Sequence, residues 1–261
     1  MPRRGVIYLV SGPRSYLSEL QTSLRSLRRH EPDLPVTVFS RYALPRGTRA
    51  DHVHYDNEHH PLKQKVLVLR ESPYEQTLFL DTDTTVLGRI RDIFEYLDDL
   101  NFAVAHAYLA DRSHQPPVLL DLVDPREFNT GVLLYDESDP TRRFLDRWRD
   151  VVLPQDPADM WAGHNCDQSY FNRIVPAGAP QECGVQFGTF PNTVYNVRGL
   201  MVDEMKGRDM WKSARIFHHR TRRMKVRKAL FSATDPAMVR DMARRGSHKA
   251  WRRVKALAPT R

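Results

Sequence analysis

Two aspartates, Asp81 and Asp83, directly follow a short apolar run at 77–80. The run comes soon after Pro73 and predicts a buried strand. In an open α/β sheet, ligands bind in the crevice at the carboxyl ends of the strands, so both carboxylates are expected at such a crevice. Carboxylates that are ionised and buried need a counter-charge. A Mg²⁺ or Mn²⁺ ion that holds a phosphorylated ligand is the natural partner, because both ions prefer oxygen ligands.

An Asp-x-Asp pair alone is a weak signal, since it also occurs on solvated turns. The run from Asp81 to Val86 also fits the way haloacid-dehalogenase phosphatases begin, and Asp81 would then be the nucleophile. In those phosphatases the nucleophile strand normally opens the domain. Here it lies well inside the chain, and no later Gly-Asp-x-x-x-Asp sequence follows to complete a metal site. The phosphatase interpretation is therefore an alternative that the rest of the chain does not favour.

A second group of possible metal ligands lies at 51–61, DHVHYDNEHHP. It contains four histidines: His52, His54, His59 and His60. A zinc site is one interpretation and a solvated loop is the other. No cysteine lies nearby and the spacing is not that of a known ligand pair, so the loop is favoured.

The composition limits the classes of protein that the chain can belong to. Its 261 residues suit one large domain or one and a half, and 41% hydrophobic content is enough for a core. Only two cysteines occur, Cys166 and Cys183, which argues against a disulfide framework and suits a reducing compartment. No apolar run is long enough to span a membrane. The apolar run at 5–10 is too short for a signal-peptide core, so we expect a cytoplasmic protein.

The charge is concentrated at one end of the chain. Residues 220–261 hold 14 of the 40 basic residues and 2 of the 32 acidic ones, which gives +12 there and −4 in the remainder. Apolar residues including Trp251 recur in this segment near helical spacing, and a basic amphipathic helix of this kind favours an anionic membrane surface. The alternative is a helix that packs its apolar stripe on the body. Charge alone would favour nucleic acid, but no base-stacking aromatic pattern accompanies it, so that partner is not expected.

The opening of the chain predicts a βαβ unit. Residues 5–10 form the first strand and 35–39 the second. Leucines at three- to four-residue spacing predict an amphipathic helix between them. These are Leu17, Leu20, Leu24 and Leu27. No Gly-x-Gly-x-x-Gly follows the first strand, so a dinucleotide site of the Rossmann type is not supported.

Later segments bring further polar residues to predicted strand and helix ends. A helix at 63–70 would carry Lys65 back over the phosphates, with a solvent-facing lysine as the alternative. A helix at 90–97, a strand at 102–106, a Pro-rich acceptor-side loop at 114–125 and a helix at 141–152 are also predicted.

Three further segments carry candidate site residues. A strand at 128–135 begins with Asn129, Thr130 and Gly131, where glycine permits close approach of a ligand. A helix at 163–174 has Asp167 and Gln168 in its first turn, pointing into a site or serving as an ordinary cap. A last strand at 215–217 is followed by His218 and His219, either of which could complete a metal shell.

Taken in order, seven segments resemble glycosyltransferase family 8, the group that includes glycogenin, galactinol synthase and bacterial lipopolysaccharide sugar transferases. The segments are Tyr16 with 26–27 behind it, Lys65, FLDTD at 79–83, FNTGVLLYD at 128–136, CDQSYFN at 166–172, FPNTVYN at 190–196 and IFHH at 216–219. The resemblance implies an α/β fold of GT-A type, with a mixed, mostly parallel, Rossmann-like sheet flanked by helices. This domain would cover 1–219, and 220–261 would be a basic helical extension.

The resemblance also implies roles for individual residues. Asp81 and Asp83 would hold Mn²⁺, or Mg²⁺, and the ribose side of a nucleotide sugar, with His218 as the third protein ligand. Lys65 would contact the diphosphate, and Tyr16 would pack near the base, which in this family is usually uracil. The remaining implied residues face the sugar: Asn129, Gly131, Asp167 and Gln168, of which Asn129, Asp167 and Gln168 would serve catalysis.

The chain departs from the family after its histidine. The usual glycine and Lys-Pro-Trp, which close over the diphosphate, are replaced by RTRRMKVRK. Arg220, Arg222, Arg223 or Lys225 would take over that contact.

The function expected from the resemblance is transfer of a hexose from a UDP-sugar to a glycan, lipid-linked or protein acceptor, with retention of the anomeric configuration. The alternative is an inactive transferase-like scaffold that acts as a basic binding protein. The enzyme would lie at the inner face of a membrane if the basic extension binds lipid.

Overall fold

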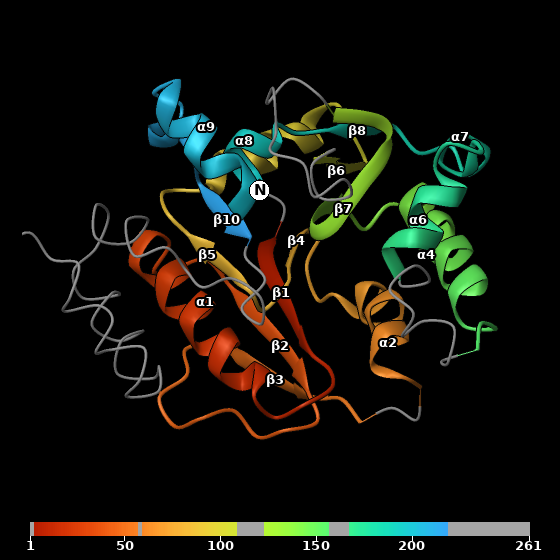
Figure 1. Ribbon diagram of the computed structural model, residues 1–261. Coiled ribbons are helices and arrows are strands. Elements are labelled where there is room, and N and C mark those ends of the chain that lie inside the picture. The colour runs from red at the N-terminus through yellow and green to blue at the C-terminus, as the bar shows by residue number, and fades with distance from the viewer. Residues whose placement is uncertain (1–2, 57–58, 109–122, 157–166, 219–261) are drawn as a thin grey trace, which may run out of the picture. The chain divides into compact units, whose positions relative to one another are not determined.

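The computed structural model describes residues 3–56, 59–108, 123–156 and 167–218 (Figure 1). Its centre is a seven-stranded sheet of order β3-β2-β1-β4-β7-β6-β8. The strands are β1 (Arg4–Val10), β2 (Val36–Ser40), β3 (Asp51–His54), β4 (Gln76–Leu80), β6 (Phe102–Tyr108), β7 (Val123–Asp136) and β8 (Phe187–Thr189). β7 is antiparallel to both of its neighbours, and the other pairs are parallel. The predicted mixed, mostly parallel α/β sheet is confirmed.

Helices cover both faces of this sheet (Figure 1). α1 (Tyr16–His30) packs on one face, and α2 (Pro61–Val68), α4 (Asp139–Val152) and α6 (Asp167–Ile174) pack on the other. Successive residues of a strand point to opposite faces. In β1, Tyr8 accordingly joins the core under α1, and Ile7 joins the core that contains Trp148.

A second, three-stranded sheet holds the residues that follow β4 beside the end of the described chain. Its order is β5-β10-β9, with β5 at Thr84–Val86, β9 at Val197–Arg198 and β10 at Ile216–His218. β10 runs antiparallel to β5 and parallel to β9, so that His218 lies opposite both Thr84 and Arg198. This small sheet therefore brings three distant segments together at the carboxyl end of β4.

Short helices complete the described chain. They are η1 (Leu69–Glu71), η2 (Arg91–Asp98), α7 (Ala179–Glu182), α8 (Asn192–Tyr195), η3 (Gly199–Met201), α9 (Val202–Gly207) and η4 (Trp211–Ser213). The predicted helix at 90–97 is thus a 3₁₀ helix. Residues 51–54, which were expected in a solvated loop, form the exposed edge strand β3.

A buried chain of hydroxyl groups ties α1 to the turn after β4. The Tyr8 hydroxyl lies 2.9 Å from Ser23 Oγ, and Ser23 Oγ lies 2.9 Å from Thr84 Oγ1. Thr84 Oγ1 donates to the carbonyl oxygen of Asp81 at 2.8 Å. Burial raises the pKa of Tyr8, so its hydroxyl stays neutral. These bonds hold the backbone between β4 and β5 against the main sheet.

Within the described ranges, no helix combines the length and the apolar composition needed to cross a membrane. Several predicted features lie outside those ranges. They are His219, Lys225, the basic extension at 220–261, residues 163–166 of the predicted helix and most of the predicted acceptor-side loop.

Candidate functional site

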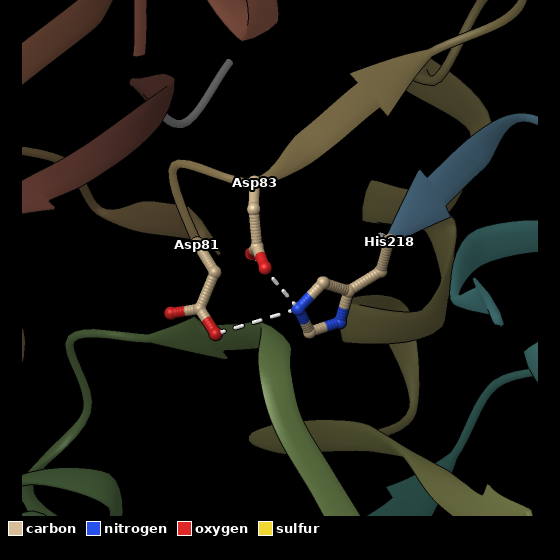
Figure 2. Close-up of side chains that lie close together, drawn as sticks. All are labelled: Asp81, Asp83 and His218. Carbon is tan, nitrogen blue, oxygen red and sulfur yellow. Dashed lines mark ion pairs between the residues drawn. The ribbon is translucent and has the colours of Figure 1, made fainter. Parts of the chain in front are cut away.

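The carboxylates of Asp81 and Asp83 and the imidazole of His218 point toward one another (Figure 2). His218 Nε2 lies 3.1 Å from Asp83 Oδ1 and 3.6 Å from Asp81 Oδ2. One potential ligand atom from each residue lies within 4.8 Å of the other two. Both aspartates are half-buried and His218 is buried. The three side chains are thus close enough to hold a single ion.

The donor set fits a divalent cation. Two carboxylates supply the oxygen ligands and negative charge that Mg²⁺ and Mn²⁺ prefer, and the imidazole adds a nitrogen ligand. Without an ion, burial raises the pKa of Asp81 and outweighs the opposing effects of Lys65 and His218. An ion placed between the carboxylates would offset the free-energy cost of burying their negative charge, because it favours their ionised form.

Gly131 leaves room for the His218 ring. A Cβ atom built on Gly131 would overlap the ring and lie 2.5 Å from its Nδ1 atom, closer than real Cβ contacts allow. The carbonyl oxygen of Gly131 accepts a hydrogen bond from the Asp81 backbone N–H at 2.9 Å. The sequence predicted close approach of a ligand at this glycine, and that stays a prediction; the group that lies against Gly131 in the structure is the His218 side chain.

Lys65 lies between two carboxylates from different elements. Its Nζ atom is 3.1 Å from Asp81 Oδ1 and 3.0 Å from Asp167 Oδ2, and it donates to the carbonyl oxygen of Thr130 at 3.3 Å. The side chain is 13% exposed. Burial lowers the pKa of Lys65, but Asp167 and Asp81 outweigh that effect and raise it overall. Lys65 is therefore charged, and its three N–H donors face three oxygens.

Hydrogen bonds join the first turn of α6 to the start of the buried part of β7. Thr130 Oγ1 donates to Asp167 Oδ2 at 3.0 Å. Gln168 Oε1 accepts from Asn129 Nδ2 at 3.1 Å and from the Thr130 backbone N–H at 3.3 Å. The indole N–H of Trp148 donates to the Asp167 carbonyl oxygen at 3.0 Å. The predicted sugar-facing residues thus form one connected group.

Two residues of the site were not predicted from the sequence, Asn196 and Arg198. Asn196 Nδ2 donates to Asn129 Oδ1 at 3.0 Å, and its Oδ1 lies 3.0 Å from His218 Nδ1. Arg198 Nη1 lies 2.9 Å from the same ring nitrogen. Both side chains are buried. The segment at 190–196 was recognised only as a whole, and Arg198 lies beyond it in a two-residue strand with no pattern of its own.

Tyr16 lies at the same edge of the sheet, at the start of α1. β1 and β4 are parallel with Tyr8 opposite Leu80, so their carboxyl ends are level. Gly12, in the turn after β1, has a φ of +90°, and a Cβ atom there would lie 3.4 Å from the Tyr16 ring. Among the described residues, no hydrogen bond or ion pair joins Tyr16 to the aspartates, so its predicted place beside a base stays a prediction.

The histidines of β3 are separate from this site. His52 and His54 lie on an exposed edge strand with ring centroids 6.5 Å apart. Among the described residues, the group of three or more potential ligands close enough to hold a metal is Asp81, Asp83 and His218. Nothing in the described part of 51–61 favours the zinc interpretation.

Solved glycosyltransferases share this architecture. The glycosyltransferase GlyE of Streptococcus pneumoniae TIGR4 is 17% identical with a TM-score of 0.57, over 92% of this chain and 63% of GlyE. A glycosyltransferase involved in glycosylation of the major capsid of PBCV-1 is 13% identical with a TM-score of 0.52, over 83% of this chain and 93% of that one. The bifunctional glycosyltransferase WbbM is 12% identical with a TM-score of 0.54, over 83% of this chain and 45% of WbbM.

These likenesses decide the fold. It is of GT-A type. The chain spans less than two thirds of the length of GlyE, and identities this low establish the fold without the activity. No protein-family model matches the sequence, and a search of curated proteins finds no match.

Proposed function

We propose that this protein is a metal-dependent glycosyltransferase that moves a hexose from a nucleotide-diphosphate sugar, a UDP-sugar, to a glycan, glycolipid or protein acceptor. The observation that carries the proposal is the convergence of Asp81, Asp83 and His218 at the carboxyl end of β4, in a fold shared with solved glycosyltransferases. The resemblance to family 8 supports the same function.

Asp81, Asp83 and His218 would hold Mn²⁺ or Mg²⁺. The bound ion would supply Lewis-acid stabilisation of the negative charge that develops on the departing diphosphate. His218 is kept in place for this task by the small space beside Gly131 and by Asn196, whose Oδ1 lies 3.0 Å from Nδ1.

The charges around the site support a dianionic ligand held through a cation. The connected side chains include three carboxylates, of Asp81, Asp83 and Asp167, and two cations, Lys65 and Arg198. With His218 neutral as a ligand, a divalent ion turns this small excess of negative charge into a small excess of positive charge. A diphosphate would then meet an attractive field that is in place before it binds.

Asn129, Asp167 and Gln168 are proposed to bind the sugar. Asp167 shares one oxygen, Oδ2, with Lys65 and Thr130 in this structure. A carboxylate fixed in this way could stabilise an oxocarbenium-like transition state. Retention would require either a carboxylate nucleophile or attack by the acceptor from the side of the leaving group.

Release of UDP from a panel of UDP-sugars, with and without Mn²⁺, tests this function. We expect Mn²⁺-dependent release by the wild type, and loss of it in Asp83→Ala, because the ion loses a ligand. The matched control is Asp98→Ala, which removes an exposed carboxylate on η2 and should leave the rate unchanged. Equal trace rates in wild type and Asp83→Ala would refute the proposal. Nucleotide binding without turnover would instead identify an inactive transferase-like scaffold.

We also propose that the protein acts in the cytoplasm and that residues 220–261 bring it to an anionic membrane surface near a lipid-linked acceptor. The excess of positive charge in that segment supports this, since each Lys or Arg near an anionic leaflet contributes about 1 kcal/mol. Co-sedimentation with phosphatidylglycerol vesicles should depend on these residues, and phosphatidylcholine vesicles are the control. Equal sedimentation after their deletion would contradict the proposal.

A further inference from the structure

The Nδ1 atom of His218 has two neighbours, one that requires it to accept a hydrogen bond and one that requires it to donate one. Arg198 Nη1 lies 2.9 Å from Nδ1, and Asn196 Oδ1 lies 3.0 Å from the same atom. A guanidinium group only donates hydrogen bonds, and an amide oxygen only accepts them. In a neutral imidazole, Nδ1 either accepts or donates. Only one of the two contacts can therefore be a hydrogen bond at any moment.

The orientation of the Asn196 amide is anchored by the backbone. The Gly131 backbone N–H donates to Asn129 Oδ1 at 3.2 Å, which identifies that atom as the oxygen. Asn196 must then present its NH₂ group to Asn129, at 3.0 Å, and its oxygen to His218. The amide oxygen of Asn196 is thus a fixed acceptor for a hydrogen on Nδ1.

The two hydrogen bonds have opposite consequences for ion binding at Nε2. When Nδ1 accepts from Arg198, the ring hydrogen is on Nε2, which points at Asp83 from 3.1 Å and cannot ligate an ion. When Nδ1 donates to Asn196, the Nε2 lone pair is free for the ion. A hydrogen bond of this kind on the far ring nitrogen is what usually orients a metal-binding histidine. Ion binding therefore requires Arg198 to leave Nδ1.

The donor diphosphate offers Arg198 an alternative partner. The three N–H donors of Lys65 already face Asp81, Asp167 and the Thr130 carbonyl oxygen. Arg198 is buried on the other side of the His218 ring from the ion position, and its planar group of N–H donors matches phosphate oxygens. An anion that arrives with the ion would draw the guanidinium away from the ring.

We propose that Arg198 couples the two ligands: it withholds His218 from the ion in the free protein, and it releases His218 when its guanidinium group turns to the diphosphate. The inference rests on the proposed function, since it takes the ligand to be a nucleoside diphosphate. Coupling between two ligands is reciprocal, so Mn²⁺ tightens UDP binding by the same factor as UDP tightens Mn²⁺ binding.

Free Mn²⁺, counted by electron paramagnetic resonance with and without UDP, tests the coupling. In the wild type we expect UDP to tighten Mn²⁺ binding about tenfold or more. Arg198→Met should bind Mn²⁺ alone about fivefold more tightly and lose most of the effect of UDP. Arg198→Lys, which keeps the charge without the planar group, should fall between the two. The matched control is Arg208→Met, at the exposed residue that follows α9 and pairs with Glu204, and it should behave as wild type. Mn²⁺ binding that is unchanged or weaker in Arg198→Met would overturn the proposal.

Nitrogen-15 NMR of histidine-labelled wild type gives a readout that needs no turnover and no substitution of Arg198. The His218 signals are assigned by their loss in His218→Asn, and the diamagnetic ion Mg²⁺ replaces Mn²⁺. We expect Nδ1 to change from a hydrogen-bond acceptor to a donor when Mg²⁺ and UDP are added together. An Nδ1 that is a donor throughout would overturn the role of Arg198, and it would leave the transferase proposal to be judged by UDP release alone.

Discussion

Two lysines on α2, Lys63 and Lys65, bind different kinds of oxygen: Lys63 contacts backbone carbonyl groups, and Lys65 contacts carboxylates. Lys63 donates to the carbonyl oxygens of Leu153 and Gln155, just beyond the end of α4, at 2.7 Å in the case of Leu153. Lys65 lies between the carboxylates of Asp81 and Asp167. In the first region a cation satisfies two backbone carbonyl groups of the segment that follows a helix. In the second, a cation joins carboxylates that together still have negative charge left for an ion. The chemistry of each region therefore follows from the oxygens that the neighbouring elements supply.

The largest effect should come from a substitution that displaces the His218 side chain from the carboxylates while leaving every charged residue in place. Gly131→Ala puts a methyl group where the His218 ring lies, so the imidazole must move away from both aspartates. We expect Mn²⁺ affinity to fall about 100-fold, at the upper end of what changes around metal ligands cost. Isothermal titration with Mn²⁺ measures this fall.

Gly207→Ala on α9 is the control for this substitution, because a Cβ atom there would meet nothing within 4 Å apart from its chain neighbours and the backbone of its own helix. Unchanged Mn²⁺ affinity in Gly131→Ala would mean that His218 is not a ligand.

Lys65→Met should have the next largest effect. It leaves Asp81 and Asp167 without the cation that they share, and removing one partner of a largely buried charge pair is costly. We expect the rate of UDP release to fall at least about tenfold, with part of the loss restored in Lys65→Arg. Steady-state kinetics at saturating Mn²⁺ checks this. A rate within twofold of the wild type would show that the charge on Lys65 is dispensable.

Asp81→Asn should weaken metal binding and stabilise the metal-free protein, by an amount that depends on pH. Burial raises the pKa of Asp81 in the folded state above its unfolded value. The folded state thus binds the Asp81 proton more tightly than the unfolded state does. The stability that the protonated carboxyl contributes is fully present below the unfolded pKa and is lost as pH rises through the folded pKa. Metal-free Asp81→Asn escapes that loss and should melt a few degrees higher than the wild type at about pH 8.

The melting-temperature difference between Asp81→Asn and wild type should shrink as the pH falls and vanish below about 3, where the wild-type carboxyl is protonated in both the folded and the unfolded state. Thermal unfolding in chelator, followed by circular dichroism across this range, gives the comparison. A variant that melts lower than the wild type at every pH would contradict the raised pKa.

Lys63→Met should have the smallest effect on activity, and it tests most directly whether the Lys63 and Lys65 regions act separately. It removes hydrogen bonds to Leu153 and Gln155 but touches no carboxylate of the site. We expect the free energy of unfolding to drop by about 2 kcal/mol, typical of hydrogen bonds from a charged group, while the rate of UDP release stays within twofold. Urea unfolding and the UDP assay measure the two quantities. A loss of rate like that of Lys65→Met would mean that the two regions act as one.

Part of the site follows from local patterns in the sequence. The apolar run before Asp81 is long enough to predict β4, and a strand ending in polar residues places them at the sheet edge. Gly131 signals close approach because only glycine lacks a Cβ atom. The choice between His218 and His219 stayed open in the sequence, because adjacent residues at a strand end differ only in the face to which they point. In the structure, His218 lies beside both aspartates, and His219 is outside the described residues.

Other parts depend on contacts that no local pattern carries. β9 has two residues, too few to show a period, so Arg198 could not be told apart from the many other arginines of the chain. The bond from Asn196 to Asn129 joins residues 67 positions apart. β3 is exposed at all four positions, and a strand without a buried face has no hydrophobic signal to distinguish it from a loop.

The pairing of β5 with β10 has a consequence for biosynthesis. Translation produces Asp81 and Asp83 well before the last described strand, and the imidazole is added only when residue 218 emerges from the ribosome. Closing so long a loop is among the slower steps of folding. The growing polypeptide consequently cannot acquire its three-ligand set until every strand of the main sheet has been synthesised, so a wrong cellular metal that binds earlier would meet only the two carboxylates.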